Sequence, residues 1–179
     1  MEKVLGIITE YNPFHNGHLY HLNESKKQTN CQYSICVMSG NFTQRGATSI
    51  IDKWSKAKTA IQNGIDLVIE LPTLYAISSA ENFAYGAIKI LDSLNIVTDI
   101  SFGTESNNID LLTNIAHLLL TEPEEFKTFL NEELNKGSSF PKAREIACAK
   151  YLQKDSPENL LLYNNILSSP NNILGIEYL

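Results

Sequence analysis

The segment that most constrains the fold runs from Lys3 to His21 and reads KVLGIITEYNPFHNGHLYH. Its first part, Lys3–Thr9, is a nearly continuous apolar run with several β-branched residues, as is typical of a strand in a parallel sheet covered on both faces. Asn12-Pro13 breaks this pattern, and a helix is predicted over His18–Lys27. The sequence therefore predicts a buried strand that leads through a loop into the start of a helix.

This strand, loop and helix start predict a phosphate site. Gly17 lets the backbone approach a ligand closely, and free N–H groups in the first helical turn can bind an anion. His15 and His18 add two imidazoles, which can donate hydrogen bonds to phosphate oxygens where charge develops. The alternative is that His15, His18 and His21 are surface or metal-binding histidines, since His-x-x-His alone is a common pattern.

Strand and helix signals alternate through the first hundred residues. Such alternation predicts an α/β fold with a Rossmann-like, doubly wound parallel sheet. Ser49 and Asp52 resemble a capping box at the start of the second helix, and Gly64 is a suitable stop for it. The other predicted strands are Tyr33–Met38, Asp66–Leu71 and Val97–Phe102, and the other predicted helices cover 50–63 and 79–94.

Helical patterns dominate beyond Ser106. We therefore expect a Rossmann-like core over 1–106 and a helical extension of the same domain over 107–179. The expected helical segments are IDLLTNIAHLLL, EEFKTFLNEEL, FPKAREIACAKYL, ENLLLYNNIL and NNILGIEYL. The last of them stops without a cap or a polar tail, which predicts that the chain is truncated before a further region.

Composition narrows the class of protein. The 179 residues suffice for one domain with a sizeable core. Neither a membrane span nor a signal peptide is predicted, so we expect a cytoplasmic protein. Cys31, Cys36 and Cys148 lack the CxxC spacing, which indicates neither disulfides nor structural zinc.

The charge is unevenly divided along the chain. The net charge is −6; residues 1–90 hold eight Lys and Arg against seven Asp and Glu, whereas residues 91–179 hold six against thirteen. Domains that bind nucleic acid are usually basic. If RNA is a partner, we therefore expect most of its contacts to lie elsewhere.

Two basic residues follow the second predicted strand. Ligands of doubly wound sheets bind beyond the carboxyl ends of the strands, where this loop should lie. Arg45 lies in the loop Ser39–Thr48 and is a candidate for binding a small carboxylate or a phosphate, the alternative being a solvated arginine. Lys53 lies near the start of the next helix and has the same two interpretations.

HNGH in this setting matches the HxGH signature of the nucleotidyltransferase superfamily related to class I aminoacyl-tRNA synthetases. More narrowly, the chain resembles the N-terminal catalytic domain of the tRNA(Met) cytidine acetate ligase family. The resemblance covers nearly the whole chain in the family's order. It rests on EYNPFHNGHLYHL, MSGNFTQRG, IIDKW, DLVIELP, SAENFAYGA, SFGTES and PNNILGIEYL.

The resemblance implies an ATP-dependent ligase that acts in two steps. Acetate attacks ATP to give acetyl-adenylate and pyrophosphate, and the acetyl group then passes to N4 of the wobble cytidine of elongator tRNA(Met). His15 and His18 would be catalytic, with Arg45 and Lys53 as the further candidates, and Mg²⁺ would arrive with the nucleotide rather than on protein ligands. The implied ATP-binding residues are Ile7, Ile8, Thr9, Glu10, Tyr11, Asn12, Pro13, Phe14, His15, Asn16, Gly17, His18, Leu19, Tyr20, Gly103 and Asn171.

Gly103 and Asn171 are predicted to contact ATP for two separate reasons. A glycine after a buried strand lets a base or ribose press against the backbone, and the resemblance places adenosine there. The side chain of Asn171 can donate to and accept from an adenine edge, although the alignment with the family motif could be shifted by one residue. The alternative is that this Asn is an ordinary helix cap.

Other functions remain open at this point. A small-substrate adenylyl- or cytidylyltransferase would need the same phosphate site, because the fold does not choose the second substrate. A non-catalytic nucleotide-binding module is the other alternative, since related enzymes complete the triphosphate site with a basic residue from a later motif that this sequence lacks. We expect tRNA(Met) to bind mainly through the region beyond Leu179, so that this chain alone binds ATP weakly and does not complete the acetylation of cytidine.

Overall fold

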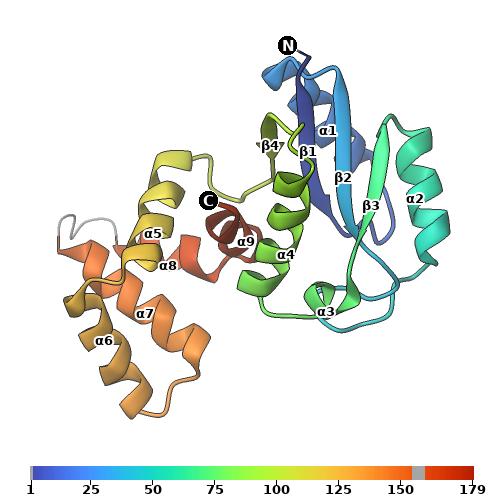
Figure 1. The fold of residues 1–179 in the computed structure, drawn as a ribbon. Helices are drawn as coiled ribbons and strands as arrows, with labels where there is room; N and C mark the ends of the chain where they lie inside the picture. The colour runs from blue at the N-terminus through green and yellow to red at the C-terminus, as the bar shows by residue number, and fades with distance from the viewer. Residues whose placement is uncertain (1, 155–159) are drawn as a thin grey trace. The chain divides into compact units, whose positions relative to one another are not determined.

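A computed structural model of the chain describes residues 2–154 and 160–179. The chain divides into two compact units, Met1–Gly103 and Thr104–Leu179. Figure 1 shows strands only in the first unit and helices throughout the second. Each unit has its own buried apolar cluster, so each is described by itself.

The first unit is built on a four-stranded sheet in the order β3-β2-β1-β4. Its strands are β1 Val4–Thr9, β2 Tyr33–Ser39, β3 Leu67–Leu71 and β4 Asp99–Ser101, and every neighbouring pair is parallel. The strand order turns back at β1, because β4 pairs with β1 on the side opposite to β2. This parallel sheet confirms the predicted Rossmann-like fold and places a switch point at the carboxyl ends of β1 and β4.

Alternating residues of β1 face helices on opposite sides of the sheet. Leu5 and Ile7 belong to a buried cluster with Leu22 and Ala60. These two partners lie on α1 Asn16–Thr29 and α2 Lys53–Gln62. Gly6 faces the other side, where an added Cβ would lie 2.9 Å from Cδ1 of Leu91. Leu91 belongs to α4 Ala80–Ser93, so β1 is covered on both faces. The close packing of α4 leaves no space for a side chain at position 6.

The predicted boundaries need four corrections. The helix α1 begins at Asn16, before the predicted His18, because His15 caps it. The predicted capping box of Ser49 and Asp52 is wrong: Asp52 is the N-cap of α2, and its Oδ1 accepts from the N–H groups of Trp54 and Ser55. The strand β4 is shorter than predicted, and the short helix α3 Thr73–Ala76 after Pro72 was not predicted.

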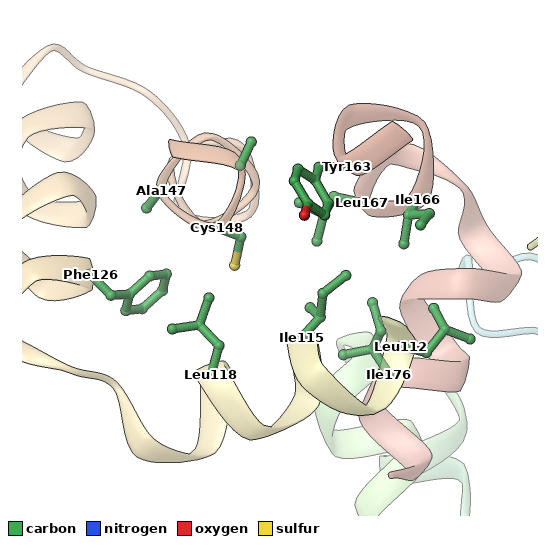
Figure 2. Packing of buried hydrophobic residues seen from close by; sticks show 11 residues of the cluster. Leu112, Ile115, Leu118, Phe126, Ala147, Cys148, Tyr163, Ile166, Leu167 and Ile176 are labelled. Carbon is green, nitrogen blue, oxygen red and sulfur yellow. The ribbon is translucent and has the colours of Figure 1, made fainter. Parts of the chain in front are cut away.

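The second unit is helical, as predicted. Its helices are α5 Ile109–Thr121, α6 Glu124–Asn135, α7 Phe140–Gln153, α8 Leu160–Ser168 and α9 Pro170–Tyr178. The predicted segment that became α8 starts at Glu158, which lies outside the described residues. In Figure 2, Leu118 of α5, Phe126 of α6 and Cys148 of α7 point toward one another. This shared apolar contact holds three successive helices together.

None of the helices in residues 2–154 and 160–179 has the length and apolar content that a membrane span requires.

Two leucines of α5 provide a matched test of the core of the second unit. Leu118 is 4% exposed and packs in the buried cluster, whereas Leu120 is 84% exposed. We expect Leu118→Ala to lower the free energy of unfolding by about 2–5 kcal/mol, because it leaves a cavity. The control Leu120→Ala should change it by about 0.5 kcal/mol or less. Urea denaturation measures both, and equal effects would contradict this packing.

Candidate functional site

The loop between β1 and α1 is fixed from within by Tyr11. Tyr11 is 2% exposed and has a positive φ of 43°, which reverses the chain at the end of β1. Its ring contacts the rings of Phe14 and His18, with centroids 4.7 and 4.8 Å away. The Asn12-Pro13 peptide bond in this turn is cis. The buried aromatic ring therefore anchors the loop that carries His15 and His18.

His15 and His18 cap α1 reciprocally. Nδ1 of His15 accepts from the N–H of Gly17 at 3.1 Å, and Nδ1 of His18 accepts from the N–H of His15 at 3.2 Å. The two imidazoles stack with centroids 3.7 Å apart. Because both Nδ1 atoms accept, each neutral ring carries its proton on Nε2. The pair therefore presents two Nε2–H donors on the sides of the rings away from the capped backbone.

The environment of His18 favours this neutral form. Burial, with further contributions from His15 and His21, lowers the pKa of His18 to about 4. A protonated Nδ1 would also lose the hydrogen bond from the N–H of His15. His18 is thus a hydrogen-bond donor without a positive charge at neutral pH.

The hydrogen bonds of the first turn correct one expectation. We expected free backbone N–H groups at this helix start, but two of them have partners. The N–H of Gly17 donates to Nδ1 of His15, and the N–H of His18 donates to the carbonyl oxygen of His15 at 2.9 Å. Gly17 favours the close approach of the ring, since an added Cβ would lie only 3.0 Å from Cε1 of His15. The imidazoles themselves therefore supply the donors for an anion.

His21 connects the helix α1 to the end of β4. Its Nε2 lies 3.1 Å from Oγ of Ser101, which in turn lies 2.6 Å from Oγ of Ser25. Burial lowers the pKa of His21, so that the ring is neutral in this network. The sequence left open a metal-binding role for the three histidines; within the described residues, no group of three or more His, Cys, Asp or Glu is placed to hold a metal ion.

Gly103 follows β4 at the switch point. It is exposed, and no atom lies within 4 Å of the position that a Cβ would occupy there. The pairing of Ile7 with Ser101 puts β4 beside β1 just before this glycine. The open backbone at Gly103 therefore lies beyond the carboxyl end of the strand next to β1.

The second loop at this end of the sheet, residues 40–50, is called the Arg45 loop below. The N–H of Gln44 donates to Oε1 of Glu10 at 2.5 Å, and the N–H of Ile50 donates to Oδ1 of Asn12 at 2.7 Å. The side-chain amide of Gln44 also donates to the carbonyl of Ser78, at 2.8 Å. These bonds bring the loops after β1, β2 and β3 together, as the topology predicts.

Arg45 lies at the turn of this loop. It is exposed, and it comes directly before Gly46, whose φ of 77° suits a glycine. In the part of the chain that the structure describes, no hydrogen bond or ion pair holds its guanidinium group. The neighbouring Gln44 is nevertheless bonded to Glu10, so the loop brings Arg45 to the first loop with its charge available to a ligand.

Lys53 is less available than Arg45. Its Nζ forms an ion pair with Oε2 of Glu70 at 2.7 Å and lies 5.2 Å from the centroid of the Trp54 ring. Its backbone N–H donates to Oδ1 of Asn41. The charge of Lys53 is thus balanced in this conformation, and its role toward an anion stays a prediction.

Lys56 was missed by the sequence analysis. Its side chain is 0% exposed, and its Nζ donates to the carbonyl of Gly40 at 2.9 Å and to Oγ of Ser49 at 3.2 Å. Burial lowers the pKa of Lys56, and the nearby carboxylates of Glu10 and Glu70 oppose that decrease. The signal was available, because Lys56 lies four residues before Ala60, on the buried face of α2.

Asn171 belongs to the second unit and is exposed in the first turn of α9. Its N–H and that of Asn172 donate to the carboxylate of Glu105, at 3.2 and 2.9 Å. Asn172 is 2% exposed, and its Oδ1 accepts from the N–H groups of Glu105 and Ser106. Of the two possible registers, Asn171 is the one whose side chain is accessible.

The remaining predicted ATP-binding residues differ in access. Ile7 and Tyr11 are buried, so they shape the loop from below. Glu10 and Asn12 accept hydrogen bonds from the Arg45 loop. The other members of the segment are half-buried (Ile8, Thr9, Phe14, His18 and Leu19) or exposed (Pro13, His15, Asn16, Gly17 and Tyr20).

The low pKa of His18 makes a testable prediction about pH. Between pH 6.5, the ordinary value, and about pH 4, the unfolded chain binds a proton at His18 that the folded chain does not bind. The free energy of unfolding should therefore fall as the pH drops through this window. His18→Gln should show a smaller fall in denaturation measured at both ends of the window. An NMR titration of the His18 ring with a midpoint near 6.5 would contradict the lowered pKa of His18.

Comparison with known proteins places this geometry in a family. The family model described as HIGH Nucleotidyl Transferase matches residues 1–179. The tRNA(Met) cytidine acetate ligases of Clostridium botulinum (strain Hall) and Caldanaerobacter subterraneus subsp. tengcongensis are 58% and 55% identical over 177 residues. Each alignment covers 99% of this chain and 43% of the relative, so the chain spans less than half the length of these curated relatives.

Solved structures agree with this result. The crystal structure of Thermotoga maritima TmcAL bound with alpha-thio ATP is 47% identical and superposes with a TM-score of 0.92, over 98% of this chain and 42% of that one. The apo structure of the same protein gives a TM-score of 0.93, over 98% and 41%. With a family match along its whole length and the HNGH pair at the start of α1, the chain belongs to the HIGH nucleotidyl transferase family.

Proposed function

We propose that this chain is the ATP-binding and acetate-activating part of a tRNA(Met) cytidine acetate ligase. The single observation that carries the proposal is the pair of reciprocally capped imidazoles, His15 and His18, at the switch point of the sheet. Support comes from relatives of that name at 55–58% identity and from a similar structure bound with alpha-thio ATP. Because the chain spans 43% of those relatives, the complete reaction is attributed to the whole protein.

In the first step, the segment Ile7–Tyr20 and Gly103 would bind ATP; the contact predicted for Asn171, in the second unit, stays a prediction. The Nε2–H groups of His15 and His18 would donate to the phosphate oxygens as a carboxylate oxygen of acetate attacks the α-phosphorus. A new O–P bond forms, the bond from the α-phosphorus to the bridging oxygen breaks, and pyrophosphate leaves. Fixed donors serve such a step because they are already oriented toward the developing charge.

Arg45 is the proposed acetate-binding residue, and Lys53 is a second candidate. The guanidinium group of Arg45 can hold both carboxylate oxygens, and its loop is hydrogen-bonded to the loop of the histidines. Lys53 would first have to leave Glu70. We therefore assign the acetate to Arg45.

In the second step, N4 of the wobble cytidine would attack the acetyl carbonyl carbon. A C–N bond forms, the bond from the acyl carbon to the AMP oxygen breaks, and the amine releases a proton. An unstacked base in an anticodon loop suits this chemistry. The acidic second half of the chain favours tRNA contacts from elsewhere in the whole protein, and a substrate of this kind implies a cytoplasmic location.

Mg²⁺ would enter with the nucleotide. The residues that the structure describes group no three His, Cys, Asp or Glu side chains in a position to hold a metal ion, so the triphosphate would carry most of its ligands. When bound, Mg²⁺ would balance charge on the phosphates. The residues of this chain then act on the oxygens that the imidazoles reach.

The two histidines give the direct test of this proposal. In the complete gene product, His15→Ala and His18→Ala should each lower the rate of acetyl-adenylate formation about a hundredfold or more, because each removes a donor to the transition state. His117→Ala is the matched control, since His117 is exposed on α5 of the other unit. The rate is measured as the release of radiolabelled pyrophosphate from ATP in the presence of acetate. If both folded variants keep rates near that of the control, the phosphate-site assignment is wrong.

A further inference from the structure

Lys56 closes the base of the Arg45 loop. Gly40 and Ser49 lie near the two ends of this loop, and the Nζ atom of Lys56 donates to both. Oγ of Ser49 also donates to the carbonyl of Gly40, at 3.2 Å. A single buried ammonium group thus joins the residue that leaves β2 to the residue that leads into α2.

The surroundings of Lys56 show that a cation is suited to this position. A Cβ on Gly40 would lie 2.3 Å from Oε1 of Glu70, so this carboxylate packs directly against the backbone there. Glu10 and Glu70 both act electrostatically on Lys56. A neutral side chain of similar length would fill the same space but would leave the carbonyl of Gly40 without this donor.

The same loop is tied to the first loop at two further points. The N–H of Gln44 donates to Glu10, and the N–H of Ile50 donates to Asn12. Arg45 follows Gln44 directly, yet its own guanidinium is exposed and takes no part in these bonds. The position of Arg45 therefore depends on how the loop is held rather than on contacts of its own side chain.

We propose that Lys56 is the positioning residue of the carboxylate subsite: it fixes the Arg45 loop so that the guanidinium group meets a small carboxylate beside the phosphate site. This inference rests on the proposed function and adds to it a residue that touches neither substrate. Lys56 acts by hydrogen bonds at the base of the loop, and Arg45 acts at its turn.

The test compares isosteric variants of two lysines on one helix. Lys56→Met keeps an unbranched chain of nearly the same length and removes the ammonium group. Lys56→Arg restores a cation, and Lys58→Met is the matched control because Lys58 is exposed on α2. Acetyl-adenylate formation is measured in the complete gene product with acetate and ATP varied separately. Lys56→Met should raise the acetate concentration for half-saturation about tenfold and change that for ATP little, as expected for the loss of a hydrogen bond to a charged group.

Arg45→Ala and the double variant separate this inference from the proposed function. Arg45→Ala should also raise the acetate concentration for half-saturation about tenfold. Adding Lys56→Met should raise it little further, because both substitutions remove the same interaction, that of Arg45 with the carboxylate. Lys56→Arg should restore part of the normal response to acetate, and Lys58→Met should leave that response unchanged.

Three outcomes would overturn the assignment of Lys56. One is an unchanged acetate response in Lys56→Met while Arg45→Ala raises the requirement, which leaves the proposed function intact. Another is equal loss of ATP and acetate saturation together with lowered thermal stability, which means that Lys56 is merely structural. The third is fully additive effects of the two substitutions. If acetate supports no acetyl-adenylate formation in the wild type or in any variant, the proposed function itself is wrong.

Discussion

The reciprocal hydrogen bonds of His15 and His18 are the interaction on which the rest of the site depends. Each Nδ1 atom accepts from a backbone N–H of the helix start, and this fixes the proton of each neutral ring on Nε2. Tyr11 holds the loop from below, and Gly17 leaves room for the ring of His15. The helix start is therefore capped by the same side chains that would bind the phosphates, so folding and binding make the same demand on these residues.

The sheet then determines what else can reach this pair. Since the strand order turns back at β1, the carboxyl ends of β1 and β4 lie side by side, and His21 joins α1 to Ser101 at that place. The Arg45 loop is hydrogen-bonded to the loop after β1 through Glu10 and Asn12. The proposed phosphate and carboxylate subsites thus lie on neighbouring loops of one sheet.

Local patterns predicted much of this arrangement. The apolar run of β1 and the glycines and histidines after it are signals within a few residues, so the strand, the loop and the helix start followed from the sequence. The start of α2 did not, because Ser49 and Asp52 are both good caps. Ser49 is instead engaged with Gly40 and Lys56, which are tertiary contacts that no local pattern reveals. Lys56 was missed for the same reason: a lysine near the start of a helix is usually solvated, and only its alignment with the buried Ala60 indicated otherwise.

The measurement that tests the central claim most directly is exchange of radiolabelled pyrophosphate into ATP by the complete gene product, with and without acetate. Exchange requires reversible attack of a substrate on the α-phosphorus, which we propose takes place at the histidine pair. The account predicts exchange that depends on acetate and needs no tRNA. Exchange that depends on a different acceptor would instead indicate a small-substrate nucleotidyltransferase, and ATP binding without any exchange would indicate a binding module; either result would contradict the account.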